Sequence, residues 1–229
     1  MKTSMLILAA LAFAGAGARA EFDQANAAFA EKRYQEAAGQ YEATLREQGY
    51  SVVTLFNLAN AYYHEGKLGL AILNYERAQL LAPRIYDIAH NLSIARLKAG
   101  IVDRPAHFLS DNELSWLGSA ALLCFGATAL FRRITVRRGT VWAVASGCVL
   151  VAAMIALLLR YPEHGRAIVV AKSAPAYIAP VTVTQPLFTL TEGQPVSIRK
   201  VNGDFLLVDA GNSRRCWVTP SMVERVTPM

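Results

Sequence analysis

The feature that most constrains the fold is a period of about 34 residues at which matching positions recur in the first half of the chain. Self-similarity at one fixed period indicates a structural unit that stacks on copies of itself, because a single unit cannot bury its apolar face. Residues 21–104 are therefore expected to form a repeat domain. The matching pairs are Ala37 and Ala71, Tyr41 and Tyr75, Glu42 and Glu76, Asn57 and Asn91, Leu58 and Leu92, Ala61 and Ala95, and Gly66 and Gly100.

The apolar pattern of the middle unit predicts two helices joined by a tight turn. Gly66 permits the backbone of such a turn, and Pro83 ends the second helix. The pattern resembles the tetratricopeptide repeat over residues 22–100, which implies an all-α, protein-binding scaffold. By this resemblance, residues 91–100 begin a third, closing unit. One apolar stripe consists of Leu55, Leu58, Ala59 and Tyr62, and the facing stripe consists of Ala71, Tyr75 and Ala78.

A short stack of such units has a concave face made by the first helix of each unit. We expect this face to form a groove for an extended peptide or partner segment, with asparagine side chains bonding to its backbone. The alternative is that Asn57 and Asn91 satisfy helix ends or neighbouring carbonyl groups. The partner-binding residues predicted on or near this face are Phe56, Asn57, Asn60, Tyr63 and Asn91, with His64 beside them.

Two long uncharged runs flank the arginine-rich stretch FRRITVRRG at residues 131–139. Each run is close to the ~20 residues that span a bilayer. They predict two transmembrane helices, 113–131 and 139–160, around a loop at 132–138. Lys and Arg in short loops stay in the cytoplasm, so the loop is expected there. The alternative is a pair of buried helices in a soluble domain. The arginines that determine this topology are Arg132, Arg133, Arg137 and Arg138.

Residues 1–20 have the order of a secretory signal peptide. Lys2 gives a basic start, an apolar core follows, and small residues lead to a cleavage site after Ala20. The alternative is an uncleaved anchor, because Arg19 is unusual so near the cut. Together with the arginine loop, the signal predicts a two-pass protein of the bacterial inner membrane. The repeats and the C-terminal region would then both lie in the periplasm.

The C-terminal region, residues 166–229, predicts a small β domain. Asn202-Gly203 lies between VSIRK and FLLVD and predicts a hairpin, and Gly211-Asn212 marks another turn. The segments LTEGQPVSI and GDFLLVDAGNSRRCWVTPSMVE resemble a bacterial SH3 domain, which implies a small all-β barrel. That family usually has Trp at the place of Phe205 and Gly at the place of Cys216, and these departures weaken any inherited ligand site.

Composition and motifs favour no catalytic function. The net charge is +6, but residues 21–104 carry ten acidic and nine basic side chains, which argues against a basic nucleic-acid-binding face. The three cysteines are too few and too scattered for a disulfide framework or a zinc site, and the four histidines are dispersed. No nucleophile elbow, zinc-protease helix or phosphate-binding loop motif occurs. We therefore expect no enzymatic activity, no cofactor and no metal.

The order of segments resembles the tetratricopeptide component of the bacterial Bat, or aerotolerance-operon, family, a BatE-like protein. The resemblance implies a multi-domain membrane protein with an all-α tetratricopeptide repeat domain, two transmembrane helices and a small all-β SH3-like barrel. It also implies a non-enzymatic inner-membrane scaffold of a stress-tolerance complex. The implied partners are membrane-anchored von Willebrand factor A-type proteins and, indirectly, a MoxR-type ATPase. The alternative is a cell-wall receptor whose tail binds peptidoglycan.

Overall fold

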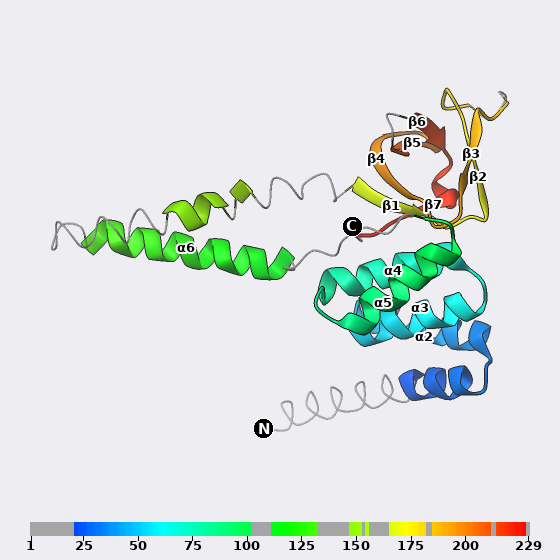
Figure 1. Ribbon diagram of the computed structural model, residues 1–229, viewed down its shortest axis with the longest axis horizontal. Helices are drawn as coiled ribbons and strands as arrows, with labels where there is room; N and C mark the ends of the chain where they lie inside the picture. The colour runs from blue at the N-terminus through cyan, green and yellow to red at the C-terminus, as the bar shows by residue number, and fades with distance from the viewer. Residues whose placement is uncertain are drawn as a thin grey trace, which may run out of the picture. The chain divides into compact units, whose positions relative to one another are not determined.

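The computed structural model describes residues 21–101, 111–131, 147–152, 154–155, 165–181, 185–211 and 214–227 (Figure 1). The chain divides into two compact units. One unit joins Met1–Ala106 to Gly165–Met229, and the other is His107–His164. The first unit contains both the repeats and the β-strands, so segments far apart in the sequence share one unit.

The repeats form a succession of packed helices, in which α2 contacts α3, α3 contacts α4, and α4 contacts α5. Tyr41 and Tyr75, at matching positions of successive units, are both fully buried in the core between these helices. The described part of the repeat region therefore has two helix pairs followed by a single helix, and the tetratricopeptide-like repeat fold is confirmed. The helices are residues 21–30, α2 (Tyr34–Gln48), α3 (Val52–His64), α4 (Leu68–Leu81) and α5 (Tyr86–Lys98).

The turns that end the first helices also recur at the repeat period. Gly66 and Gly100 have positive φ angles of 77° and 71°, a region that glycine adopts without steric cost. Lys32 occupies the matching place in the first unit, with a φ of 61°. The amide after each of these residues bonds back to the preceding helix, as in Lys67 N–H to the Tyr62 carbonyl at 2.9 Å. The first unit thus makes the same turn with a less suitable residue.

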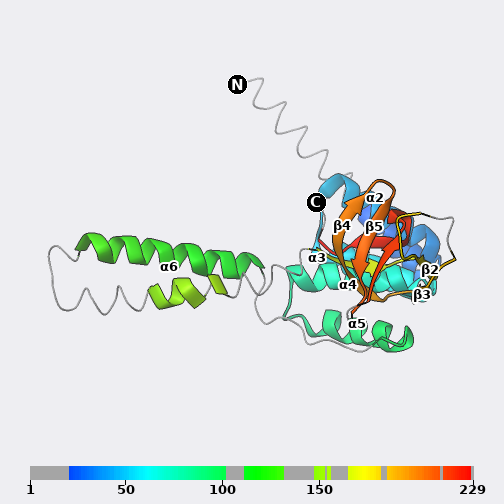
Figure 2. The same cartoon turned by 90° about the horizontal axis from the view of Figure 1, so that it is seen from above.

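The described C-terminal strands form two antiparallel sheets, one with the order β6-β5-β4-β1-β7 and one with the order β2-β3. Figure 2 shows β4 beside β5 and β2 beside β3. The predicted hairpin between β4 and β5 is confirmed, with Asn202 opposite Phe205. Its two turn residues are Gly203 and Asp204, one position later than predicted. The strands are β1 (Arg166–Val169), β2 (Ser173–Ala176), β3 (Phe188–Thr191), β4 (Pro195–Asn202), β5 (Phe205–Asp209), β6 (Arg215–Val218) and β7 (Val223–Arg225).

Strand β1 belongs to two cores at once. Its alternate residues Ala167 and Val169 lie in the core of the sheets. Ile168 points the other way and lies in the core of the repeats, together with Val226. Both faces of β1 are therefore buried, and Figure 1 shows this strand close to α4. The separate SH3-like domain that we predicted is instead part of one unit with the repeats; its membership of the SH3-like family stays a prediction.

A close backbone approach, a hydrogen bond and an ion pair hold the sheets on α4. A Cβ atom on Gly69 would lie 2.5 Å from the Val169 carbonyl oxygen, so only glycine fits there. The Gly69 amide donates to the Glu192 carboxylate at 2.9 Å. Arg77 donates to the Glu224 carboxylate at 2.8 Å and to the Arg225 carbonyl at 2.7 Å. These contacts tie the start and the last turns of one helix to the sheets.

A buried charge cluster completes this interface. One oxygen of Glu76 accepts from Arg96 of α5 at 2.9 Å and from Arg166 of β1 at 2.8 Å. The Glu76 side chain is only 4% exposed. A buried carboxylate is tolerated when it is paired in this way. Glu76 therefore joins α4, α5 and β1.

The predicted membrane spans are wrong. Among the described residues, no helix is both long enough and apolar enough to cross a membrane. Helix α6 (Asp111–Phe131) covers the first predicted span, 113–131, but it starts with the polar residues Asp-Asn-Glu. Of the second predicted span, 139–160, the structure describes only residues 147–152 and 154–155, which are helical.

This finding also overturns the predictions that depended on the spans. The fold class of a multi-domain membrane protein and the two-pass inner-membrane localisation are wrong, and the described fold is helices plus antiparallel sheets. The physical reason is that absence of charge alone did not distinguish an apolar run from a membrane span. The predicted signal peptide, residues 1–20, and the arginine loop, residues 132–138, lie outside the described residues.

Candidate partner-binding groove

The first helices of the units, which are residues 21–30, α3 and α5, share one face that we name the first-helix face. Two matching hydrogen-bond networks join these helices. In the first, the Tyr41 hydroxyl donates to Asn26 Oδ1 at 2.6 Å, and Asn57 Nδ2 donates to the same oxygen at 3.2 Å. The network therefore connects the first helix to both α2 and α3.

The second network repeats the first one in the next unit. The Tyr75 hydroxyl donates to Asn60 Oδ1 at 2.5 Å, and Asn91 Nδ2 donates to that oxygen at 3.2 Å. Three of the five predicted partner-binding residues, Asn57, Asn60 and Asn91, thus have a structural role between neighbouring helices. This is close to the alternative that the sequence left open, although the acceptors are side-chain amides and not carbonyl groups of the backbone.

The asparagines keep unused bonding capacity. In the part of the chain that the structure describes, no hydrogen bond uses Nδ2 of Asn26 or Asn60, or Oδ1 of Asn57 or Asn91. All four side chains are half-buried, so these atoms are not sealed in the core. The face therefore presents donors and acceptors in turn, which is the chemistry of an extended peptide backbone.

The tyrosine hydroxyls stay protonated in these networks. Burial raises the pKa of Tyr75 and of Tyr41 above the ordinary tyrosine value, and it outweighs the opposite effect of the neighbouring Asn91 and Asn57 amides. A protonated hydroxyl can donate to the Asn oxygen. This donation orients each asparagine and leaves its amide nitrogen for another acceptor.

Aromatic rings gather where the first helices end. The His64 ring stacks on the Tyr34 ring with centroids 4.7 Å apart, and it meets the edges of Phe29 and Tyr63 at 5.7 Å. The Lys98 ammonium lies 4.4 Å from the centroid of the Tyr63 ring. Tyr63, a predicted partner-binding residue, therefore belongs to an aromatic and cationic end of the face.

The remaining predicted residue, Phe56, packs inward. Its ring centroid is 5.9 Å from that of Tyr75, and its side chain packs against the repeat core. Sequence reasoning missed Asn26, although it lies one repeat period before Asn60. The repeat offset that gave the other asparagines would have found it.

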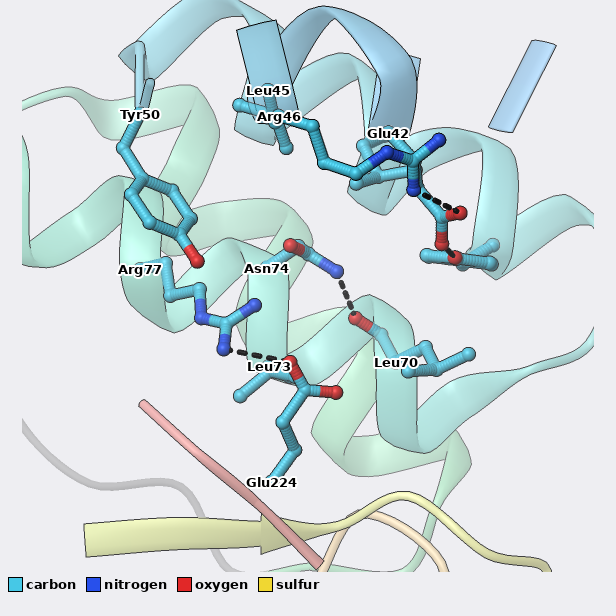
Figure 3. Close-up of a pocket in the computed structure, with 11 residues that line it drawn as sticks. Glu42, Leu45, Arg46, Tyr50, Leu70, Leu73, Asn74, Arg77 and Glu224 are labelled. Atoms are coloured by element: carbon cyan, nitrogen blue, oxygen red, sulfur yellow. Dashed lines mark hydrogen bonds and ion pairs between the residues drawn. The ribbon is translucent and has the colours of Figure 1, made fainter. Parts of the chain in front are cut away.

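A second hollow lies on the side of the second helices, α2 and α4, and α3 also contributes to its wall. A cavity of 270 Å³ is lined by α2, α3, α4, Tyr50 and, across from them, Glu224 of β7. Figure 3 shows its charged residues, with Arg77 bound to Glu224 and Arg46 beside Glu42. No motif in the sequence indicated this cavity, because it needs the sheets docked on α4.

The described side chains include no obvious reactive or metal-binding centre. Burial, helped by Asp209, raises the pKa of the Cys216 thiol to about 11, so this thiol stays protonated and packs as an apolar group. Trp217 pairs with Tyr177 through an isolated bridge in the sheets. Within the described ranges, no group of three or more His, Cys, Asp or Glu side chains could hold a metal ion.

No protein-family model matches the chain, and no curated protein matches it. Among solved structures, the type III secretion translocator chaperone SycD of Yersinia enterocolitica is 15% identical, with a TM-score of 0.35, over 61% of this chain and 85% of that chain. PcrH from Pseudomonas aeruginosa is 14% identical, with a TM-score of 0.36, over 60% and 92%. SycD in complex with a peptide of the translocator YopD is 14% identical, with a TM-score of 0.35, over 61% and 93%. At these identities and TM-scores, the likeness assigns this chain neither a partner nor an activity.

Proposed function

We propose that this protein is a non-enzymatic adaptor whose first-helix face holds an extended segment of a partner protein. The observation that carries the proposal is the duplicated asparagine network. Each network uses one amide atom of every asparagine to hold the helices and leaves the other for a ligand. A row of oriented amides at a regular spacing fits the regular donors and acceptors of a peptide backbone.

The substitution Asn60→Asp tests this idea sharply. The carboxylate retains an oxygen to accept from Tyr75 and Asn91, so the internal network is kept. The unused amide nitrogen becomes an oxygen and can no longer donate to a partner carbonyl. Loss of one hydrogen bond weakens binding by about 2- to 10-fold. The matched control is Gln35→Glu, an exposed residue of α2 that undergoes the same change of charge.

Photocrosslinking in the native cells provides the readout. A benzoylphenylalanine placed at Tyr63 should form adducts with a partner protein, whereas one at the exposed Ile178 of the C-terminal region should not. Asn60→Asp should reduce the Tyr63 adducts, and Gln35→Glu should leave them unchanged. Equal adducts from both positions, or adducts that Asn60→Asp does not affect, would contradict the proposed groove.

The identity of the crosslinked protein tests the finer hypothesis that came from the Bat resemblance. A von Willebrand factor A-type protein among the adducts, with a MoxR-type ATPase in the same complex, would support a Bat-type adaptor. Any other partner with the same dependence on Asn60 would keep the adaptor and discard the Bat assignment. Sedimentation of the full chain with purified peptidoglycan, unaffected by Asn60→Asp, would favour the cell-wall alternative.

A further inference from the structure

Helix α5 is the last of the described repeat helices, and Figure 2 shows it at the edge of their stack. One repeat period earlier, in α3, Val52 and Phe56 are half-buried and pack against a core that includes Ile88 of α5. The matching residues of α5, Tyr86 and His90, are exposed. The described part of the chain therefore leaves the end of the stack uncovered, at the place where a further helix would pack.

The uncovered side of α5 carries an apolar stripe, which we name the α5 outer face. Tyr86 is 73% exposed and Leu97 is 80% exposed, and the rings of Tyr86 and His90 stack with their centroids 5.4 Å apart. The terminal unit of a repeat stack normally has a polar outer surface, because that surface meets water. An apolar stripe at this place therefore indicates an interface. The α5 outer face consists of Tyr86, His90, Ile94 and Leu97, at the three- and four-residue spacing of one helix side.

The α5 outer face is complementary to its own reverse. Tyr86 and Leu97 lie at nearly equal distances before and after Leu92, and so do His90 and Ile94. Two copies of α5 that pair antiparallel about a two-fold axis near Leu92 therefore place Tyr86 of one copy against Leu97 of the other. In the same arrangement His90 faces Ile94. A two-fold interface requires this property, because each contact occurs twice with the roles of the copies exchanged.

Two charged residues beside the stripe have the same symmetry. Asp87 lies in the first turn of α5 and Lys98 in its last turn, and both are exposed. Their separation is close to three full helical turns, so both lie along the same edge of the stripe. In the antiparallel pair, Asp87 of each copy therefore meets Lys98 of the other. A parallel pair would hold the two charges roughly 17 Å apart along the helices. Lys98 also contacts the Tyr63 ring, but its ammonium has three donors.

We propose that the α5 outer face binds the same face of a second copy of this chain, as an antiparallel pair of helices. A segment of another protein requires neither the symmetric spacing of the apolar residues nor the two charges on one edge, whereas a second copy requires both. One helix stripe buries less area than the roughly 1,200 Å² at which stable interfaces begin. We therefore expect a weak dimer that dissociates on dilution. This contact is independent of the first-helix groove.

Sedimentation equilibrium of the full chain, from low to high micromolar concentration, tests the proposal. Asp87→Lys places two lysine–lysine contacts in the interface and should weaken self-association about tenfold, and Lys98→Asp should do so through two aspartate–aspartate contacts. The double variant Asp87→Lys/Lys98→Asp exchanges the charges and restores both pairs, so it should associate within about threefold of the wild type. The matched control is Asp204→Lys, the same change of charge at an exposed residue of the β4–β5 turn, which should have no effect.

A mixture of the two single variants sharpens the test. One chain then has two basic residues at the edge of the stripe and the other has two acidic residues, so they should bind each other more tightly than either binds itself. Leu97→Gln removes an apolar contact without changing the charge, and it should also weaken the dimer. Because this side chain is 80% exposed, the variant keeps the proposal testable if a charge variant does not fold.

Three outcomes would overturn the proposal. A monomer at every concentration would assign the α5 outer face to another protein or to another part of this chain. A dimer that neither Asp87→Lys nor Leu97→Gln weakens would place the contact elsewhere on the molecule. A dimer that the charge exchange does not restore, or that Asp204→Lys weakens equally, would reject the antiparallel pairing of α5.

Discussion

The second helices of the two repeat units, α2 and α4, have matching sequences but meet different neighbours. Glu42 of α2 is 42% exposed and accepts from the hydroxyl of the buried Tyr62, whereas its counterpart Glu76 is 4% exposed between two arginines. Ala43 of α2 corresponds to Arg77 of α4, which binds the sheets. The comparison shows that the repeated sequence pattern determines where the helix forms. The docked strands determine which residues on its surface are buried and what those residues bind.

The largest expected effect separates the two glutamates. Glu76→Gln removes the carboxylate that binds Arg96 and Arg166, and breaking a buried pair in this way should lower the free energy of unfolding by about 3 kcal/mol. Glu42→Gln, at the matching place on the surface, should cost about 1 kcal/mol or less. Guanidinium unfolding of the full chain measures both. Equal losses would mean that the buried cluster does not hold the sheets.

The next effect concerns the close approach of α4 to β1. Gly69→Ala places a Cβ atom 2.5 Å from the Val169 carbonyl oxygen, and the forced shift should cost about 1–3 kcal/mol. The counterpart in α2 is the exposed Gln35, where alanine should have little effect. Thermal unfolding compares the two variants. An unchanged Gly69→Ala protein would contradict the packing of β1 against this helix.

A smaller effect separates the turns of the two units. Lys32 holds a left-handed backbone conformation that costs a side-chain-bearing residue about 1–2 kcal/mol, and Gly66 holds the same conformation without that cost. Lys32→Gly should therefore stabilise the protein by about 1 kcal/mol, and Gly66→Ala should destabilise it by a similar amount. Urea unfolding gives both signs. Two changes of the same sign would refute the equivalence of the turns.

The smallest effect at neutral pH concerns the tyrosines of the two networks. Burial raises the pKa of both hydroxyls, so their protonated forms stabilise the fold fully below the unfolded tyrosine pKa of about 10. This contribution is lost as the pH rises through the folded-state pKa. Stability measured from pH 9 upward should fall less steeply in Tyr75→Phe than in the wild type. The control Tyr41→Phe should change the slope less, because only for Tyr75 is the rise large.

Much of the repeat region could be predicted because its signals are local. The repeat offset placed Tyr41 and Tyr75 in matching buried positions, and Gly66 marked a turn that the structure contains. The groove residues could be predicted only in part. Asn57 and Asn91 lie on the expected face, but their bonds to Asn26 and Asn60 depend on how neighbouring helices stack. The two predicted spans failed because a run without charges carries no information about its surroundings.

The sequence by itself determined the helix pairs, their turns and the hairpin between β4 and β5. Periodicity and glycine placement act over a few residues, and each unit repeats the same local physics. Only the tertiary structure decided that β1 lies between two cores, that Glu76 is buried with Arg96 and Arg166, and that a cavity forms between α2, α4 and β7. Each of these features includes contacts between residues about 90 to 150 positions apart, such as Arg166 with Glu76 and Arg77 with Val226. Contacts at such separations depend on how surfaces fit in space, and no local pattern in the chain encodes that fit.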